Sequence, residues 1–388
     1  MQYLYDENQR KYIDCINNVQ HVGHCNKIVV DSIAKQLLQS TCNSRFVSTK
    51  LVECAQEILK TLPGFDTILF CNSGSEANDL ALRLARDFTK HNDAIVLDHA
   101  YHGTVTTTMQ LSPYKFNHGC TIKQPNWVHV APCPDVFRGR YRLSDNELHD
   151  EDCIKNAGNL YAKDVQHILE QNKKSNRTIA AFFAEALQSC GGQIVPPNNY
   201  FAEVARNQKT KFSKSKFLNY KFQNLEFTAD IITMGKSIGN GYPVAAVATR
   251  KEIADSLGGN VGYFNTYGGN PVACAAVLAV LSVLKTDDLL NHSQQMGKIF
   301  NSELNKLKNK HKCIGDVRGI GMFWGIDLVK DKENRTPDKH LANTLTDLLR
   351  NKYGILISAD GPYSNVLKIK PPMCFTESDL YEVIKIFE

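Results

Sequence analysis

The sequence predicts an α/β fold, with a large domain built on a mostly parallel sheet flanked by helices and a smaller α+β domain after it. Two observations support this fold class. Short runs rich in β-branched and aromatic residues alternate with helical patterns along most of the chain, which is the order of a parallel sheet. After a long apolar segment, strands and helices alternate again. With 388 residues, of which 43% are hydrophobic and 22% charged, the chain can bury a core for both domains.

We expect the strands of the large domain at five short runs of β-branched, aromatic and other apolar residues. These runs are TILFC (67–71), AIVLD (94–98), IAAFFA (179–184), DIITM (230–234) and VAAVAT (244–249). Between the first two, apolar residues recur at helical spacing. They predict an amphipathic helix whose buried face holds Ala77, Leu80, Ala81, Leu84, Ala85 and Phe88.

The domain boundaries follow from one long apolar segment. Residues 270–285 are apolar on most sides and predict a buried helix that ends the large domain. Beyond it, strands are expected within 315–329, 353–358 and 365–370. We therefore expect an N-terminal segment that packs with the small domain, then the large domain, then the small domain, over residues 1–30, 31–285 and 286–388.

Composition excludes several classes of protein. The net charge of +5 is too small to indicate a nucleic-acid partner. The 12 cysteines show no C-x-x-C pair and no metal-ligand spacing, which favours free thiols in a reducing compartment and no metal site. No run approaches the roughly 20 apolar residues of a membrane helix, and the start, MQYLYDENQR, lacks a targeting pattern. We expect an intracellular protein of the cytoplasm or mitochondrial matrix, with no membrane partner.

The stretch 206–227 shows neither the periodicity of a helix nor the alternation of a strand. It is dense in Lys, Asn, Ser and Phe. Basic residues interleaved with aromatic ones can bind single-stranded nucleic acid. Long polar loops are more often solvated insertions, and we favour that interpretation.

Lys236 follows the predicted strand 230–234 within the sequence TMGKSIGNGYP. It is not the lysine of a phosphate-binding P-loop, because Asp230 stands where that motif requires glycine. Nor is there a G-x-G-x-x-G motif, because Val244 takes its last position. A lysine after an apolar strand, in a turn of small residues, can be partly desolvated, so that its amine attacks a carbonyl and forms a Schiff base. The alternative is a solvated loop lysine.

A second motif, FCNSGSEAND (70–79), passes from a strand through Ser73, Gly74 and Ser75 into a helix. Free backbone N–H groups and the positive helix end then face one point and could hold a phosphate. The alternative is an ordinary helix N-cap formed by Ser75 and Glu76.

Together with DHAYHG (98–103) and FNTYGGNP (264–271), these motifs resemble the class III aminotransferases, which are fold-type I enzymes that use pyridoxal phosphate. The resemblance covers nearly the whole chain apart from 206–227. It implies that Lys236 carries the cofactor and that the cofactor-binding residues are Gly74 and Ser75 on the phosphate, Tyr101 stacked on the pyridine ring, and His102 and Glu185 close by. It also implies a homodimer in which Thr266 reaches the phosphate of the neighbouring subunit's cofactor.

Four further motifs are similar to the phospho-lyase branch of this family, whose substrates are ethanolamine phosphate and 5-phosphohydroxy-L-lysine. They are IDCINNVQHVGHC (13–25), SPYKFNHG (112–119), WVHVAPCPDVFRGRYR (127–142) and NVLKIKPPMCF (365–375). Typical amino-acid transaminases have an arginine near the position of Lys370, whose planar fork holds an α-carboxylate. A 2-aminoethyl phosphate unit has no carboxylate on the reacting carbon. Arg45 and Lys370 are the candidate substrate contacts.

The resemblance implies a specific reaction. The substrate amine displaces Lys236, the freed lysine removes a proton, and phosphate leaves from the adjacent carbon. Hydrolysis then gives an aldehyde and ammonia, with no amino acceptor. Two alternatives stay open, namely a class III ω-aminotransferase and a catalytically impaired or inactive remnant of the family.

The remnant is considered because one family motif is missing. Family members have a strand ending in Asp-Glu-(Val/Ile)-Gln before the lysine strand, and its aspartate pairs with the pyridine nitrogen. Here the only acids from 186 to 229 are Glu203 and Glu226. Asp230 precedes Lys236 by six residues on one predicted strand, roughly 20 Å away. A missing central strand would leave both of its neighbours without hydrogen-bond partners.

Overall fold

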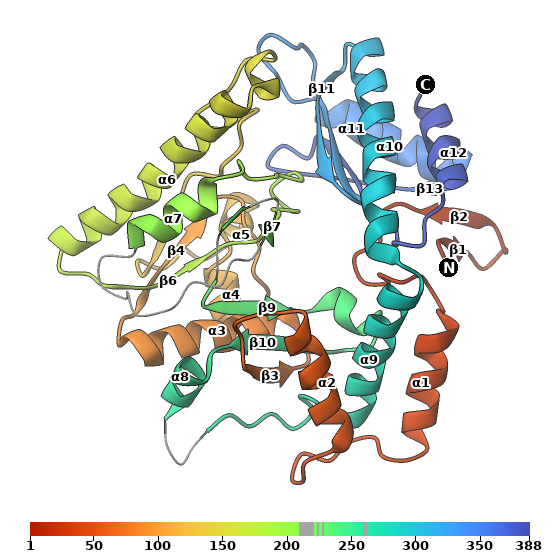
Figure 1. Ribbon diagram of the computed structural model, residues 1–388. Coiled ribbons are helices and arrows are strands. Elements are labelled where there is room, and N and C mark those ends of the chain that lie inside the picture. The colour runs from red at the N-terminus through yellow and green to blue at the C-terminus, as the bar shows by residue number, and fades with distance from the viewer. Residues whose placement is uncertain (209–220, 223–224, 227–228, 259–261) are drawn as a thin grey trace.

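The computed structural model describes residues 1–208, 221–222, 225–226, 229–258 and 262–388. The predicted insertion 206–227 therefore lies mostly outside the described residues. The helices are α1 (Lys27–Leu37), α2 (Thr49–Lys60), α3 (Gly74–Thr89), α4 (Thr106–Gln110), α5 (Pro113–Asn117), α6 (Glu151–Lys174), α7 (Tyr200–Gln208), α8 (Lys251–Ala254), α9 (Pro271–Thr286), α10 (Leu289–Lys310), α11 (Lys339–Leu348) and α12 (Glu377–Phe387) (Figure 1). None of the helices in these ranges is both long and apolar enough to cross a bilayer.

The strands follow the runs predicted from the sequence to within one or two residues in the large domain. They are β1 (Tyr3–Tyr5), β2 (Lys11–Asp14), β3 (Thr67–Cys71), β4 (Asp93–Leu97), β5 (Val128–Ala131), β6 (Ile179–Phe183), β7 (Lys221–Phe222), β8 (Leu225–Glu226), β9 (Ile231–Met234), β10 (Ala245–Thr249), β11 (Ile314–Ile320), β12 (Phe323–Leu328), β13 (Ile355–Leu356), β14 (Ser358–Asp360) and β15 (Val366–Ile369).

β4 lies at the centre of a parallel sheet, between β5 and β6. Ile95 of β4 pairs with His129 of β5 and with Phe182 of β6. Alternate side chains of β4 pack against α6 and α7 on one face and against α3 on the other. Every residue of β4 is therefore buried, as a strand covered on both faces requires.

A second sheet contains β10 between β3 and β9, and both of its ladders are antiparallel. β10 therefore runs antiparallel to both of its neighbours. A short turn leads from Met234 to Ala245, and parallel pairing of consecutive strands needs a crossover of a dozen or more residues. α3 covers one face of this sheet, and α2 and α9 cover the other.

α3 joins the two sheets. It packs against β10 and β9 of one sheet and against β6 of the other. Ala77, Leu80, Ala81, Leu84 and Ala85 of α3 are buried, as predicted. Phe88, expected on the same face, is exposed instead. It lies in the last turn of the helix, which ends at Thr89.

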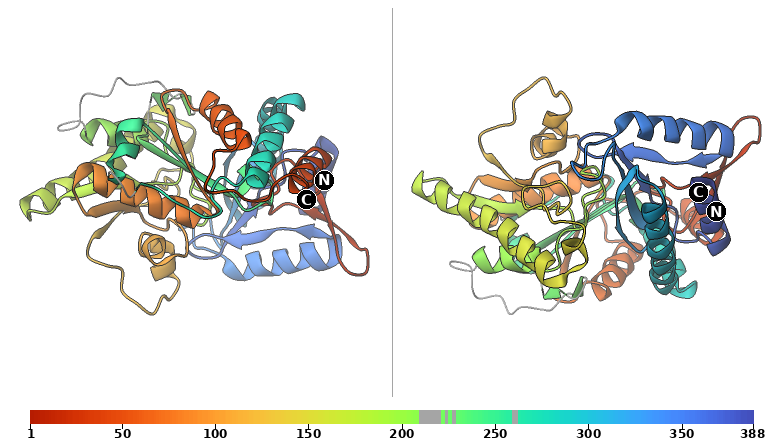
Figure 2. Two further views of the ribbon diagram at one scale, coloured as in Figure 1. Left: turned by 90° about the horizontal axis from the view of Figure 1, so that it is seen from below. Right: turned by 90° about the horizontal axis from the view of Figure 1, so that it is seen from above.

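The C-terminal part is a second layered unit. Its antiparallel sheet has the order β11, β12, β15, β14, and its apolar core includes residues of α10, α11 and α12. β2 pairs with β1 and with β13, so the N-terminal segment adds a small sheet to this unit. The two chain ends consequently lie side by side in both views of Figure 2.

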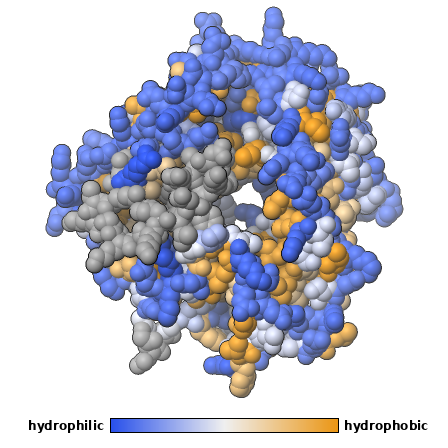
Figure 3. Space-filling view, viewed as in Figure 1, coloured by the Kyte–Doolittle hydropathy of each residue, from blue (hydrophilic) through white to orange (hydrophobic). Residues whose placement is uncertain are grey.

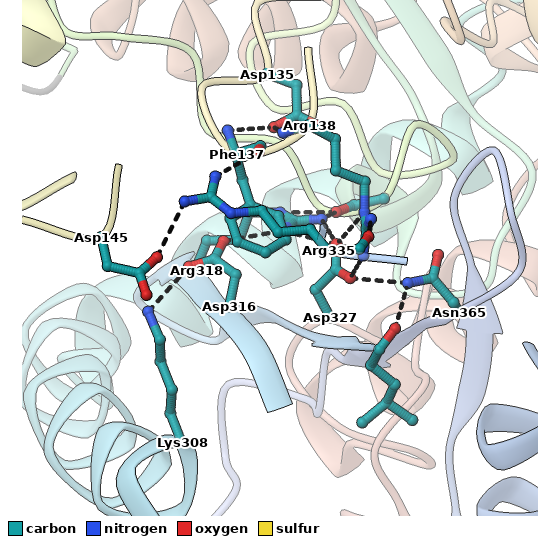
Figure 4. A network of polar contacts seen from close by, with 12 residues as sticks. Asp135, Phe137, Arg138, Asp145, Lys308, Asp316, Arg318, Asp327, Arg335 and Asn365 are labelled. Atoms are coloured by element: carbon teal, nitrogen blue, oxygen red, sulfur yellow. Dashed lines mark hydrogen bonds and ion pairs between the residues drawn. The ribbon is translucent and has the colours of Figure 1, made fainter. Parts of the chain in front are cut away.

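Charged side chains connect this unit to the rest of the chain (Figure 4). Asp327 of β12 accepts hydrogen bonds from Arg318 of β11 and from Arg138, which lies in the loop after β5. Arg318 also donates to the carbonyl of Gly192, at 2.6 Å and 3.0 Å. The network therefore ties the loops after β5 and β6 to the C-terminal sheet.

Candidate active site

Lys236 lies where β9 ends and a short 3-10 helix, Lys236–Gly239, begins. Its φ of 44° is in the left-handed region, which costs a non-glycine residue energy and is often retained at functional sites. Gly235 brings this turn against the start of α3, because a Cβ there would lie 3.3 Å from the backbone nitrogen of Gly74. The Lys236 side chain is exposed. The expectation of a partly desolvated lysine is thus wrong for this structure, because the residue has already left the sheet layer.

The start of α3 lies next to the turn that carries Lys236, and there is open space beside its first residue, Gly74. Ser73 is the N-cap, and its hydroxyl accepts a hydrogen bond from the N–H of Glu76 at 3.3 Å. A Cβ built on Gly74 would meet nothing within 4 Å. The alternative in which Ser75 is the N-cap is wrong, because Ser75 already has helical geometry and its hydroxyl accepts from the N–H of Thr104 at 3.1 Å. Open space beside free helix N–H groups can accommodate a phosphate.

Gly103 packs closely against Ser75 in this turn, and the close contact leads to a prediction. It has a φ of 138°, and a Cβ there would lie 2.5 Å from the Ser75 hydroxyl and 2.9 Å from the Ser75 Cα. We expect Gly103→Ala to lower the free energy of unfolding by roughly 2–3 kcal/mol, measured by urea titration, and to weaken cofactor binding. Gly119→Ala is the control, because that glycine also has a positive φ of 85° but open space around it. If both substitutions lowered the free energy of unfolding equally, the close packing of Gly103 against Ser75 would not be the cause.

A chain of hydrogen bonds brings together side chains from distant segments. The N–H of Tyr101 donates to Glu185 Oε1 at 2.9 Å, and the N–H of Ser189 donates to Glu185 Oε2 at 3.3 Å. The ammonium of Lys370 lies 3.3 Å from the Ser189 hydroxyl. Tyr101, Glu185 and Lys370 are thus neighbours although they are far apart in the sequence.

Burial shifts the pKa values of this cluster. It raises the pKa of Glu185 to about 6, against the opposing effects of the two N–H groups and of Lys236 and Lys370. Burial, together with the like charges of Lys368 and Lys236, lowers the pKa of Lys370 to about 8. Lys236 therefore lies close enough to interact with both Glu185 and Lys370. An excess of positive charge around a partly buried site favours an anionic ligand.

His102 is buried beside this cluster. Its N–H donates to the Ser112 hydroxyl at 2.8 Å, and its carbonyl accepts from Asn78 at 2.8 Å. Burial lowers the pKa of His102 to about 4, so the imidazole is neutral at pH 7. Within the described residues, its Nε2 has no hydrogen-bond partner.

Arg45 and Thr266 are not joined to this cluster by any contact within the described residues. Both are exposed. The Arg45 guanidinium lies 5.4 Å from the ring centroid of Phe264, and the thiol of Cys42 donates to the carbonyl of Thr266 at 3.3 Å. The loops that carry these two residues therefore pack against each other at the surface.

Asp230, considered above as a partner for the pyridine nitrogen, lies at the other end of β9 from Lys236. It is exposed, and its carboxylate accepts from Arg250 at 2.9 Å. It is therefore a surface ion pair.

Sequence reasoning missed Lys368. Its ammonium lies 2.7 Å from Asp360, and only 8% of the residue is exposed. A signal was present, because the alternation in NVLKIK places Lys368 and Lys370 on the same side of a strand. A further cavity of about 360 Å³ is lined by the charged network of Figure 4, but Lys236 does not line it.

These residues fit pyridoxal phosphate at its aldehyde and at its phosphate group. Lys236 offers the amine for the aldehyde, and the open turn at Gly74 and Ser75 offers N–H groups for the phosphate. Tyr101 lies nearby with an aromatic face. The face in Figure 3 is hollowed near its centre, above β9 and beside α10 in the orientation of Figure 1. Fold and site together define an enzyme of the fold-type I, pyridoxal-phosphate-dependent class.

Comparison with known proteins gives the family. The family described as "Aminotransferase class-III" matches residues 2–211 and 218–388, and the chain belongs to it. The chain is 61% identical over 398 aligned residues to "Ethanolamine-phosphate phospho-lyase homolog 1" of Caenorhabditis elegans, covering 99% of this chain and 85% of that protein. It is 44% identical to "Alanine--glyoxylate aminotransferase 2-like" of Drosophila melanogaster, covering 99% and 79%. A solved phospholyase from Arthrobacter, in complex with phosphoethanolamine, superposes with a TM-score of 0.87 at 31% identity and covers 100% of this chain and 91% of its own.

Proposed function

We propose that this protein is a phospho-lyase that uses pyridoxal phosphate and removes phosphate from a 2-aminoethyl phosphate unit. Its substrate would be ethanolamine phosphate or 5-phosphohydroxy-L-lysine, and its products an aldehyde, ammonia and phosphate. The observation that carries the proposal is Lys370, which is partly buried and lies close enough to Lys236 for the charge of Lys236 to lower its pKa. An ammonium group can hold a phosphate as a point charge, but it lacks the planar fork with which arginine holds a carboxylate through two hydrogen bonds. The Caenorhabditis relative and the Arthrobacter structure support the same chemistry.

In this proposal each residue has a separate task. The cofactor, when bound, supplies an electron sink for the carbon that bears the substrate nitrogen. Lys236 removes the proton from that carbon. Glu185 holds the Tyr101 backbone in place through the 2.9 Å hydrogen bond. Lys370 holds the phosphate and stabilises the negative charge on it as it leaves.

The deciding experiment omits any amino acceptor. Purified protein is incubated with pyridoxal phosphate and ethanolamine phosphate, and inorganic phosphate and acetaldehyde are measured. We expect both to form in equal amounts. A requirement for pyruvate or another keto acid would show an ω-aminotransferase instead.

The lowered pKa of Lys370 predicts a pH dependence of substrate binding. Below about pH 8 its ammonium is charged, and above it the charge is lost, so the KM for ethanolamine phosphate should rise as the pH passes 8. A hydrogen bond to a charged group contributes about 1.5–3 kcal/mol, which corresponds to a change of roughly 10- to 100-fold. Lys370→Arg keeps its charge and should lose this alkaline rise, and Lys370→Met should have a high KM throughout. An identical alkaline rise in all three proteins would assign it to another group.

We also propose that the protein is a homodimer with Thr266 at the interface. Large apolar side chains are exposed on the two loops that meet there and on the end of α1, among them Phe46 at 76%, Val47 at 80% and Leu38 at 91%. Exposed apolar patches of this kind mark association surfaces. Sedimentation should show a dimer that the double substitution Phe46→Ser and Val47→Ser dissociates. A monomeric unaltered protein at micromolar concentration would refute the interface.

The domain division and compartment are proposals of the same kind. The pairing of β2 with β13 supports an N-terminal segment, 1–30, that belongs with a small domain over 286–388, next to a large domain over 31–285. All 12 cysteines are free, which supports the cytoplasm or mitochondrial matrix, where thiols stay reduced.

One observation favours a second candidate, an inactive remnant. β6 and β9 are the edges of two separate sheets, and no described strand lies between them. A visible-absorption scan after addition of pyridoxal phosphate distinguishes the candidates. An absorption band that disappears in Lys236→Ala supports the enzyme, and the absence of any band supports the remnant.

A further inference from the structure

The second of the four phospho-lyase motifs forms α5 with its two caps, and it packs against the loop that carries Tyr101. The N–H of Tyr114, in the first turn of α5, donates to the carbonyl of Ala100 at 3.1 Å. The N–H of His102 donates to the Ser112 hydroxyl at 2.8 Å. Because these two hydrogen bonds lie on either side of Tyr101 in the sequence, they hold Tyr114 next to the candidate site.

Two neighbouring rings hold the ring of Tyr114 in place. Its centroid lies 6.0 Å from that of the Tyr101 ring at an angle of 77°, which is the edge-to-face arrangement that aromatic pairs favour. The centroid of the His118 ring lies 4.2 Å from that of the Tyr114 ring. The Tyr114 carbonyl accepts a hydrogen bond from His118 Nδ1 at 2.7 Å, so this nitrogen of the imidazole carries a proton. The orientation of the phenol is therefore set by the protein before a ligand binds.

The hydroxyl of Tyr114 is available to a ligand. Tyr114 is half-buried, and its hydroxyl has no hydrogen-bond partner among the described residues. Burial raises the pKa of Tyr114, and the negative charge of Asp360 raises it as well. The phenol therefore keeps its proton at neutral pH and offers one hydrogen-bond donor.

The charges near Tyr114 indicate which ligand this donor meets. Asp360 influences the pKa of Lys370 as well as that of Tyr114, so the ammonium and the phenol belong to one region of the site. Asp360 itself is neutralised by Lys368, 2.7 Å away. In the described part of the chain, the hydrogen-bond partner of the Lys370 ammonium is the neutral hydroxyl of Ser189, at 3.3 Å. A neutral donor near an ammonium that has no carboxylate partner suits an anion with several acceptor oxygens, such as a phosphate.

We propose that the Tyr114 hydroxyl donates a hydrogen bond to a terminal oxygen of the substrate's phosphate and shares that phosphate with Lys370. This role rests on the proposed function and makes Tyr114 a specificity-determining residue for it. A phosphate ester has three terminal oxygens, so it can accept from both donors while its bond to carbon breaks. An amine without a phosphate leaves both donors unpaired in a partly buried site, and a site of this kind rejects such an analogue.

The test measures phosphate binding without turnover, so its outcome is separate from that of the proposed reaction. Inorganic phosphate is titrated by calorimetry into the whole protein loaded with pyridoxal phosphate, whose own phosphate occupies the turn at Gly74. Tyr114→Phe removes one oxygen atom and keeps the ring contacts. Tyr381→Phe is the matched control, because that tyrosine lies on α12 and is 46% exposed. Ethylamine, which has the amine and both carbons of the substrate but no phosphate, is titrated in parallel while the absorption of the cofactor is followed.

We expect Tyr114→Phe to weaken phosphate binding roughly 10- to 100-fold, as for a lost hydrogen bond to a charged group, and to leave the response to ethylamine unchanged. Tyr381→Phe should bind phosphate like the unaltered protein. Equal phosphate affinity in all three proteins, no phosphate binding by the unaltered protein, or an equal loss of ethylamine and phosphate binding in Tyr114→Phe would each overturn the proposal. If the unaltered protein releases phosphate from ethanolamine phosphate but the phosphate affinities are equal, the proposed function stands and only the role of Tyr114 is refuted.

Discussion

Replacing Lys236 by alanine is expected to lower phosphate release from ethanolamine phosphate by at least ~10³-fold, because no other amine takes over its proton transfer. Lys370, another amine of this cluster, donates a hydrogen bond to the Ser189 hydroxyl at 3.3 Å. The measurement is phosphate release under saturating cofactor.

Two further substitutions make this result specific. Lys236→Arg keeps a positive charge but cannot form a Schiff base at neutral pH, and it should be as inactive as the alanine variant. Lys27→Ala removes an exposed lysine that is paired only with Asp31, and it should leave the rate unchanged. Activity of Lys236→Ala within tenfold of the unaltered protein would exclude Lys236 as the catalytic amine.

Asp327→Ala is expected to reduce the free energy of unfolding by about 3–5 kcal/mol, because it leaves buried guanidinium groups without their carboxylate. Asp327 is fully buried and accepts from Arg138, Arg318 and Asn365. Burial alone lowers the pKa of Arg318, but Asp327 and Asp316 outweigh it and raise that pKa above its usual range. Urea unfolding followed by circular dichroism measures the loss.

The matched control is an exposed ion pair. Asp347 lies 2.7 Å from Arg350, and both side chains are more than half exposed. Asp347→Ala should therefore cost no more than about 1 kcal/mol. If Asp327→Ala were equally mild, the network of Figure 4 would not hold the C-terminal sheet to the loops after β5 and β6.

The local patterns of the sequence were reliable where a single physical rule decides the outcome. Apolar periodicity placed α3 and the strands of the large domain, and the apolar segment 270–285 gave the buried helix α9. The motifs around Lys236 and Gly74 predicted the class III family and its pyridoxal phosphate cofactor, and the family match confirms the family. These features are local, because they depend on neighbours within one turn or one strand.

Other features depend on the path of the chain and could not be predicted locally. The reversal of β10 depends on the short turn from Met234 to Ala245, and the exposure of Phe88 depends on where the sheet ends. The choice of Ser73 over Ser75 as N-cap depends on a two-residue difference in where α3 begins.

The sequence by itself determined that this chain is an α/β enzyme of the class III family, with one lysine after a strand and a turn of small residues before a helix. Only the tertiary structure decided that Glu185 and Lys370 lie near that lysine, and that burial raises the pKa of Glu185 and lowers that of Lys370. Among the described residues, it also placed β6 and β9 at the edges of two separate sheets. The reason is physical: secondary structure follows from neighbours in the sequence, whereas burial and sheet pairing depend on segments that are distant in it.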